Sequence, residues 1–186
     1  MTTTRNAAAG AGIIIITERM VGMNDGLFGE LTYDEGIGWC GSTLLAFGGS
    51  EYDVQLLINA EEDAEEISAL QQDAFLQWMR AWDSAQENML DALIDYYNQQ
   101  ERFAYGPDDE TENALLWQEI NTREAMMKAV TPETIVIPSD YLAEGGRTVY
   151  LLLGKAWGGE DLDDNGVGVR FVNEQIAYIG YKDIAF

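Results

Sequence analysis

The sequence predicts an α+β fold, with an antiparallel β region, two to three central helices and a second antiparallel β region arranged as a single layer of helices on a sheet. Three observations predict it. Apolar and polar residues alternate between residues 27 and 58, as in half-buried antiparallel strands. From residue 67 to 96, apolar residues recur every three or four positions, as in an amphipathic helix. Short apolar runs return between residues 134 and 180, so the order is β–α–β.

The first β region contains the clearest turns. Asp34-Glu35-Gly36 and Gly48-Gly49-Ser50 each separate two alternating runs and predict tight turns between neighbouring strands. An earlier strand is expected at Ile13–Ile16, after a flexible segment over residues 1–12. No linker or internal repeat divides the 186 residues, so we expect one domain over residues 1–186.

The central segment predicts two helices, at about 64–82 and 85–101. Asp63 followed by Glu66 predicts the start of the first helix. A single helix over the whole segment would be about 58 Å long, whereas a domain of this size is roughly 40 Å wide. A break is therefore expected at Ser84-Ala85-Gln86-Glu87, which has the form of a capping box. The unbroken periodicity leaves one long helix as the alternative.

The rest of the chain predicts one more helix and the second β region. A helix is expected from Glu112 to Ala129, after the loop Gly106-Pro107-Asp108-Asp109. Pro132 and Pro138 bracket a short strand at residues 134–137. Further strands are expected at 149–153, 167–172 and 176–180.

The charge is strongly unbalanced. Thirty-three acidic residues face ten basic residues and no histidine, giving a formal net charge of −23, where a net charge of about 2–8 suffices for solubility. Direct binding of nucleic acid or of an anionic membrane is excluded, because phosphate contacts need Lys and Arg. Three explanations remain: docking on a basic protein, binding of cations, or solvation in a salty cytoplasm.

The excess charge concentrates in the middle of the chain, where residues 51–112 hold 17 acidic and two basic residues. A solvated helix face and a docking face for a basic partner both explain this, and the scarcity of lysines at i+4 favours docking. The residues predicted to contact the partner are acidic side chains of the predicted helices: Glu61, Glu62, Asp63, Glu65, Glu66, Asp91 and Asp95.

The residue types restrict the possible chemistry. Without histidine and with one cysteine, histidine-based triads and imidazole or thiolate metal sites are excluded. Acid–base chemistry is left to carboxylates, tyrosines and three lysines. We therefore expect a protein that is not an enzyme and holds no cofactor. Cys40 has no basic neighbour in sequence and is expected to be an inert thiol.

One segment resembles half of a calcium loop. Asp161, Asp163 and Asn165 alternate and Gly166 takes the sixth position, but Val172 stands where the loop needs a bidentate Glu. An Asx-rich turn between two strands explains the same residues, so a weak Ca²⁺ site and a plain turn both stay open.

The N-terminal apolar run does not predict membrane insertion. Ala7 to Ile16 is ten residues long, well below the roughly 20 that span a bilayer, and no small-residue cleavage site follows it. Cys40 is the only cysteine and cannot form an internal disulfide, which fits a reducing compartment. We expect a cytoplasmic protein.

Three stretches carry a resemblance to a family. They are residues 33–39 (YDEGIGW), the helix with Gln71, Ala74, Phe75 and residues 93–97 (LIDYY), and the tail with residues 166–171 (GVGVRF) and 180–184 (GYKDI). In this order they resemble small bacterial domains of unknown function, some of which resemble immunity proteins of polymorphic toxin systems. The resemblance covers most of the chain between about residues 27 and 186 and implies an α+β fold with a long helical segment between β regions. It carries over no catalytic residue, and it departs at Asn173-Glu174, where a tail hairpin favours Asn-Gly.

The leading hypothesis is an immunity or inhibitor protein that presents its helical carboxylates to a basic toxin, such as a nuclease. A scaffold protein whose acidity secures solubility is the first alternative. A carboxylate-based or weakly metal-assisted hydrolase is the second.

Overall fold

The computed structural model describes residues 21–105, 116–143, 146–158 and 166–186. Within these ranges eight strands form one sheet in chain order. Its first half contains β1 (Gly22–Asp25), β2 (Gly29–Asp34), β3 (Gly38–Phe47) and β4 (Ser50–Ile58). Its second half contains β5 (Val130–Ile137), β6 (Thr148–Lys155), β7 (Val167–Val172) and β8 (Gln175–Tyr181). The expected strand Ile13–Ile16 and the segment 1–12 lie outside the described residues.

The two predicted β regions are parts of this one sheet. Neighbouring strands in the described ranges pair antiparallel, except that β4 and β5 run parallel, with Leu56 opposite Ile135. A parallel pair needs a long crossover, and the helical middle of the chain supplies it. The fold is therefore α+β, as expected, but it is dominated by strands and mixed in strand direction.

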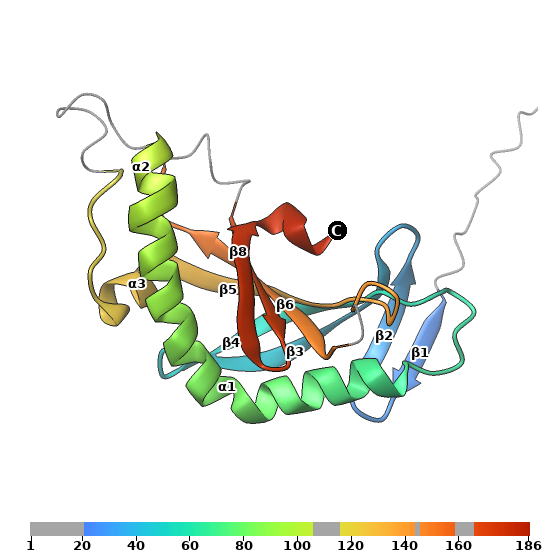
Figure 1. Cartoon of the computed structure of the whole chain (residues 1–186). Coiled ribbons are helices and arrows are strands. Elements are labelled where there is room, and N and C mark those ends of the chain that lie inside the picture. The colour runs from blue at the N-terminus through green and yellow to red at the C-terminus, as the bar shows by residue number, and fades with distance from the viewer. Residues whose placement is uncertain (1–20, 106–115, 144–145, 159–165) are drawn as a thin grey trace, which may run out of the picture.

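The helix layout differs from the prediction. One helix, α1, runs from Ala69 to Tyr96 and continues through a π-helical turn, η1 (Tyr97–Glu101), into α2 (Arg102–Tyr105). The predicted break at residues 84–87 is wrong, and the single long helix is the correct alternative. Figure 1 shows that α1 bends near its middle, so its two halves run in different directions across the domain. The bend reconciles the length of the helix with the width of the fold.

The start of α1 is also later than predicted. Asp63 and Glu66 lie in a loop, and the N-cap is Ser68, whose side chain accepts a hydrogen bond from the backbone N–H of Gln71. The Gln71 side chain accepts one from the backbone N–H of Ser68 in return, which completes a capping box. Two backbone donors at the helix start are satisfied at Ser68, so the helix begins at Ala69.

The third predicted helix is shorter than expected. Residues 118–121 are not helical, and α3 spans Arg123–Ala129, with Thr122 as its N-cap. The strand expected at 134–137 begins earlier, at Val130, because Pro132 lies at a register shift where the missing N–H is tolerated.

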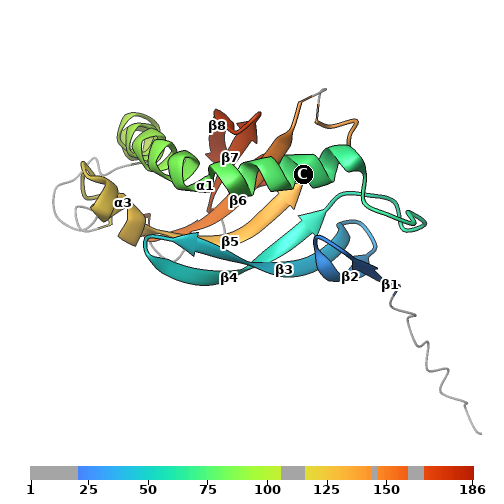
Figure 2. The same cartoon turned by 90° about the horizontal axis from the view of Figure 1, so that it is seen from below.

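The core lies between α1 and one face of the sheet, which α1 crosses (Figure 2). Trp78, Trp82 and Met89 on α1 are buried there, and the Trp78 ring contacts Phe171 of β7 with ring centroids 5.6 Å apart. On the opposite face a smaller cluster forms around Leu57, Val136, Tyr150 and Leu152. A 3₁₀ helix, η3 (Lys182–Ala185), packs on it through Ile184 and Ala185.

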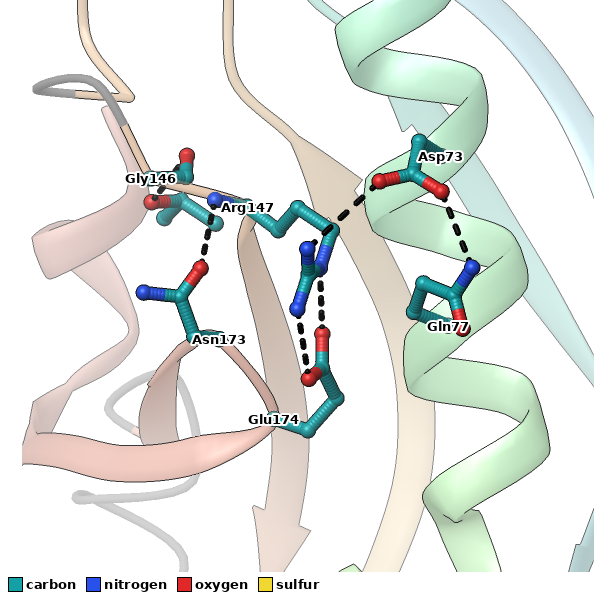
Figure 3. A network of polar contacts seen from close by, with 7 residues as sticks. Asp73, Gln77, Gly146, Arg147, Asn173 and Glu174 are labelled. Carbon is teal, nitrogen blue, oxygen red and sulfur yellow. Dashed lines mark hydrogen bonds and ion pairs between the residues drawn. The ribbon is translucent and has the colours of Figure 1, made fainter.

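The β7–β8 hairpin keeps its two-residue turn at Asn173-Glu174, and both residues have positive φ, 49° and 63°. Arg147 holds Glu174 with two hydrogen bonds of 2.7 and 2.9 Å, and its guanidinium also lies 3.6 Å from Asp73 on α1 (Figure 3). The backbone N–H of Arg147 donates to the Asn173 side chain. Arg147, directly before β6, thus ties the turn to α1, which explains how two non-glycine residues are held in the left-handed region.

Glu174→Ala is expected to be less stable than Glu174→Gly. Both variants lose the pairing with Arg147, but only alanine must keep a side chain at φ 63°, which costs about 1 kcal/mol. Urea unfolding of the two proteins measures the difference directly. Equal stabilities would show that the turn relaxes to negative φ once Arg147 is released.

Candidate functional site

An acidic loop follows β4. Its carboxylates belong to Glu61, Glu62, Asp63, Glu65 and Glu66, all of which are exposed. The loop is nevertheless anchored at both ends: the buried Trp39 donates its indole N–H to the Glu61 carbonyl at 3.1 Å, and Ile67 is buried in the core. The loop presents five carboxylates to solvent. The helix predicted to begin near residue 64 is wrong at this point, because residues 61–68 are not helical.

The turn between β2 and β3 adds two more carboxylates, Asp34 and Glu35. Carboxylates of the loop and of the turn both affect Tyr33. Its pKa is raised first by burial, then by the negative charges of Glu62 and Glu61, and then by those of Glu35 and Asp34. Trp39, which pairs with Tyr33 between β2 and β3, donates a hydrogen bond to the Glu61 carbonyl, so the start of the loop lies beside the turn. We call the seven side chains of the loop and the turn the acidic end: Asp34, Glu35, Glu61, Glu62, Asp63, Glu65 and Glu66.

The predicted contact residues do not form one surface. Asp91 and Asp95 lie on the C-terminal half of α1, on the opposite side of the domain from the loop beside β1 and β2 (Figures 1 and 2). Asp91 is already paired: Arg123 contacts it at 2.5 and 2.6 Å, and this hydrogen bonding lowers the pKa of Asp91. Five of the seven predicted residues thus belong to the acidic end and two do not.

The ion pairs of the described structure lie away from the acidic end. They involve five basic side chains: Arg123, Lys128, Arg147, Lys155 and Lys182. Within the described residues, no ion pair reaches a carboxylate of the acidic end. The carboxylates of the acidic end are therefore exposed and have no ion-pair partner among the described residues.

A second polar cluster is buried at the other side of the domain, around Glu101 in η1. The Glu101 carboxylate accepts hydrogen bonds from the Tyr96 hydroxyl at 3.1 Å and from the Trp157 indole, and it pairs with Lys155 at 3.2 Å. The Glu101 and Lys155 side chains are only 2 % and 3 % exposed. Burial, and next the charge of Glu101, raises the pKa of Tyr96.

The sequence did not predict this cluster as a site, although a signal existed. Glu101 lies four residues after Tyr97 and eight after Leu93, which places it on the buried stripe of the helix. A polar residue on such a stripe requires a partner. That partner, Lys155, is 54 residues away in β6 and has no local signature.

A pocket of about 320 Å³ opens beside this cluster, between the C-terminal part of the long helix and β8 with η3. Its lining includes three tyrosines and two carboxylates: Tyr96, Tyr178, Tyr181, Glu101 and Asp183. Pockets of a few hundred Å³ hold small ligands.

The remaining sequence-predicted groups do not form a site in the described structure. Asp161, Asp163 and Asn165 lie outside the described residues. Elsewhere in the described ranges, no group of three or more Asp, Glu, Cys or His residues is placed to hold a metal ion. The Cys40 thiol lies 3.6 Å from the Gly38 carbonyl, and burial, with a smaller effect of Asp34, raises its pKa, as expected for an unreactive thiol.

The fold and these two regions define a mixed-sheet α+β domain with an acidic end and a separate tyrosine-lined pocket. The model of a family described as a domain of unknown function (DUF6985) matches residues 27–186, and the chain belongs to this family. The description names no activity and makes no connection with immunity proteins. No curated protein and no solved structure matches the chain. In the described part of the chain, no helix is long and apolar enough to cross a membrane.

Proposed function

We propose that this protein binds a basic protein partner through its acidic end, and that it acts in the cytoplasm as an inhibitor of that partner, in the manner of an immunity protein. The observation that supports the proposal is the gathering of seven carboxylates from the β4–α1 loop and the β2–β3 turn, none of which has an ion-pair partner within the described residues. Such a charge density repels itself in the free protein and is relieved by positive charge on a partner.

The construction of the loop supports binding rather than solubility alone. Carboxylates that only keep a protein in solution need no fixed backbone. Here the Trp39 indole holds the Glu61 carbonyl, and the Gln71 side chain donates to the carbonyls of Asn59 and Pro138, each at 3.0 Å. A loop that is ordered before binding loses less conformational entropy when the complex forms.

A nuclease is the partner class that fits this surface best. An enzyme that binds nucleic acid must present positive charge around its cleft, because it contacts phosphates. Exposed carboxylates on one anchored loop compete for the same positive side chains and speed the encounter through long-range attraction.

Charge reversal of the loop tests the proposal. The partner is isolated from the native cells with the wild-type protein and purified, and its affinity is then measured for the variant Glu61→Lys, Glu62→Lys, Glu65→Lys, Glu66→Lys. We expect the dissociation constant to rise at least about 100-fold, mainly through slower association and with a steep dependence on salt. If the partner is a nuclease, its inhibition is expected to fall in parallel.

A matched control separates the acidic end from net charge. Glu51, Asp53, Asp83 and Glu119 are exposed, lie outside the acidic end, and form no ion pair within the described structure. Reversal of these four residues changes the net charge by the same amount and is expected to change affinity by less than about tenfold, by screened long-range attraction alone. Equal losses in the two variants would contradict the proposal and favour a scaffold whose acidity serves solubility.

A further inference from the structure

The pocket beside Glu101 is lined by tyrosines and carboxylates, and the function proposed for the acidic end does not involve it. Tyr96 comes from α1, while Tyr178 and Tyr181 come from β8, so aromatic side chains approach the cavity from two separate elements. Asp183 in η3 and Glu101 in η1 contribute carboxylates to the same lining. π-Helical turns such as η1 occur frequently at functional sites.

The charges around the pocket favour a cation. Lys155 pairs with the Glu101 carboxylate at 3.2 Å and is not part of the lining. The charges of Glu101 and Lys155 offset each other, and the other carboxylate of the lining, Asp183, is exposed and forms no ion pair within the described residues. The ammonium of Lys155 lies 5.7 Å from the centroid of the Tyr181 ring and 5.8 Å from that of Trp157, so aromatic faces here already accept a positive charge.

The position of Tyr178 depends on a glycine in the same strand. A Cβ added at Gly180 would lie 2.7 Å from Cε1 of Tyr178 and 3.2 Å from its hydroxyl, so the ring packs over Gly180. Tyr178 is 56 % exposed even though it lines the pocket. The Tyr178 ring lies along an edge strand and is half-exposed, so its burial stabilises the free protein little. The ring can instead cover a bound ligand.

We propose that this pocket binds a small organic cation, an ammonium group on a compact apolar body. The half-exposed ring of Tyr178 supplies a face that attracts a positive charge, Tyr96 and Tyr181 line the pocket beside it, and Asp183 supplies the countercharge. The volume of about 320 Å³ limits the ligand to a compact molecule. The site is independent of the acidic end, which lies across the domain.

Two charged probes and their neutral counterparts test the proposal on the full-length protein. Choline is compared with 3,3-dimethylbutan-1-ol, and butylammonium with butan-1-ol, by following backbone amide NMR shifts at physiological ionic strength. We expect saturable shifts at Gly180 and Ala104, which line the pocket, with at least one cation bound about tenfold more tightly than its neutral counterpart. No saturation at these residues, or equal binding of the neutral compounds, would overturn the proposal.

Variants at the pocket mouth locate the binding. Tyr178→Phe retains the aromatic face and is expected to bind the cation within about threefold of wild type, while Tyr178→Ala is expected to lose about tenfold. Asp183→Asn is expected to weaken binding of the cation but not of the neutral compound. Tyr141→Ala, at a tyrosine that is 91 % exposed outside the pocket, is the control and should change nothing. Unchanged affinity in Tyr178→Ala would exclude the pocket as the site.

The loop variant proposed above separates this site from the acidic end. If cations bind only to the exposed carboxylates of the loop, the fourfold charge reversal abolishes the shifts, which would overturn the pocket assignment. If they bind in the pocket, the shifts at Gly180 remain.

Discussion

Glu101→Gln and Lys155→Met are each expected to lower the free energy of unfolding by about 3–5 kcal/mol, because either change leaves the other charge buried without its partner. Glu101 also accepts hydrogen bonds from Tyr96 and Trp157, so its carboxylate links η1 to the end of β6. Urea unfolding followed by tryptophan fluorescence measures the loss as a lower midpoint at an unchanged slope.

The double variant distinguishes an ion pair from two independent contacts. Replacement of both members removes the unpaired charge, so Glu101→Gln with Lys155→Met is expected to cost less than the sum of the single changes, with a coupling energy of about 1–3 kcal/mol. Lys128→Met is the matched control, because it removes the same side chain from an exposed pair with Glu124, in which the side chains are 74 % and 79 % exposed. Its unfolding midpoint is expected to stay unchanged.

An outcome in which the single variants at Glu101 and Lys155 behave like Lys128→Met would contradict this account. It would mean that water reaches the cluster in the folded protein and that the pair acts as a surface pair. Additive single effects would instead assign the stability to the separate hydrogen bonds of Glu101 and to the packing of the Lys155 chain.

Local periodicity predicted much of the fold. The alternation in residues 38–58 is confirmed as the β3–β4 hairpin, with the turn at Gly48 and Gly49, both at positive φ. The helical period correctly placed Trp78, Ala85 and Met89 on the buried face of α1. These features depend on residues that are near one another in sequence, so their signals are local.

Features that depend on distant pairing were not predictable in the same way. The parallel pairing of β4 with β5 joins strands separated by the whole helical segment, and nothing in either strand specifies direction. The helix start was mistaken because Asp63 and Glu66 resemble a start signal, while the actual capping box, Ser68 with Gln71, lies inside the apolar period. One segment can contain several sequence patterns that resemble helix N-caps, and tertiary packing determines which of them starts the helix.

The candidate site was predicted only in part. Sequence identified the carboxylates of residues 61–66, because exposed charge is visible in composition. It could not show that Asp34 and Glu35 join them from another turn, or that Asp91 is paired with Arg123 from α3. The sequence gives the number of charged residues, whereas the fold determines which of them form ion pairs.

Gly38→Ala is expected to destabilise the domain by about 2–5 kcal/mol. Gly38 has φ 110°, which costs an alanine about 1–2 kcal/mol. In addition, the new Cβ would lie 2.5 Å from the Ile58 carbonyl oxygen and 3.2 Å from the Asn59 Cα, both backbone atoms, and such overpacking costs about 1–3 kcal/mol more. Ile58 is the last residue of β4, so this close contact would strain the backbone at the point where the acidic loop begins. Urea unfolding measures the loss.

Gly36→Ala provides the control within the same hairpin. Gly36 has φ 100°, but no atom lies within 4 Å of its added Cβ, so only the backbone cost of about 1–2 kcal/mol applies. The difference between the two variants therefore measures the close approach of β3 to the end of β4. Equal losses would show that the hairpin shifts away from Ile58 without cost, and the start of the acidic loop would then be less constrained than the Trp39 and Gln71 contacts indicate.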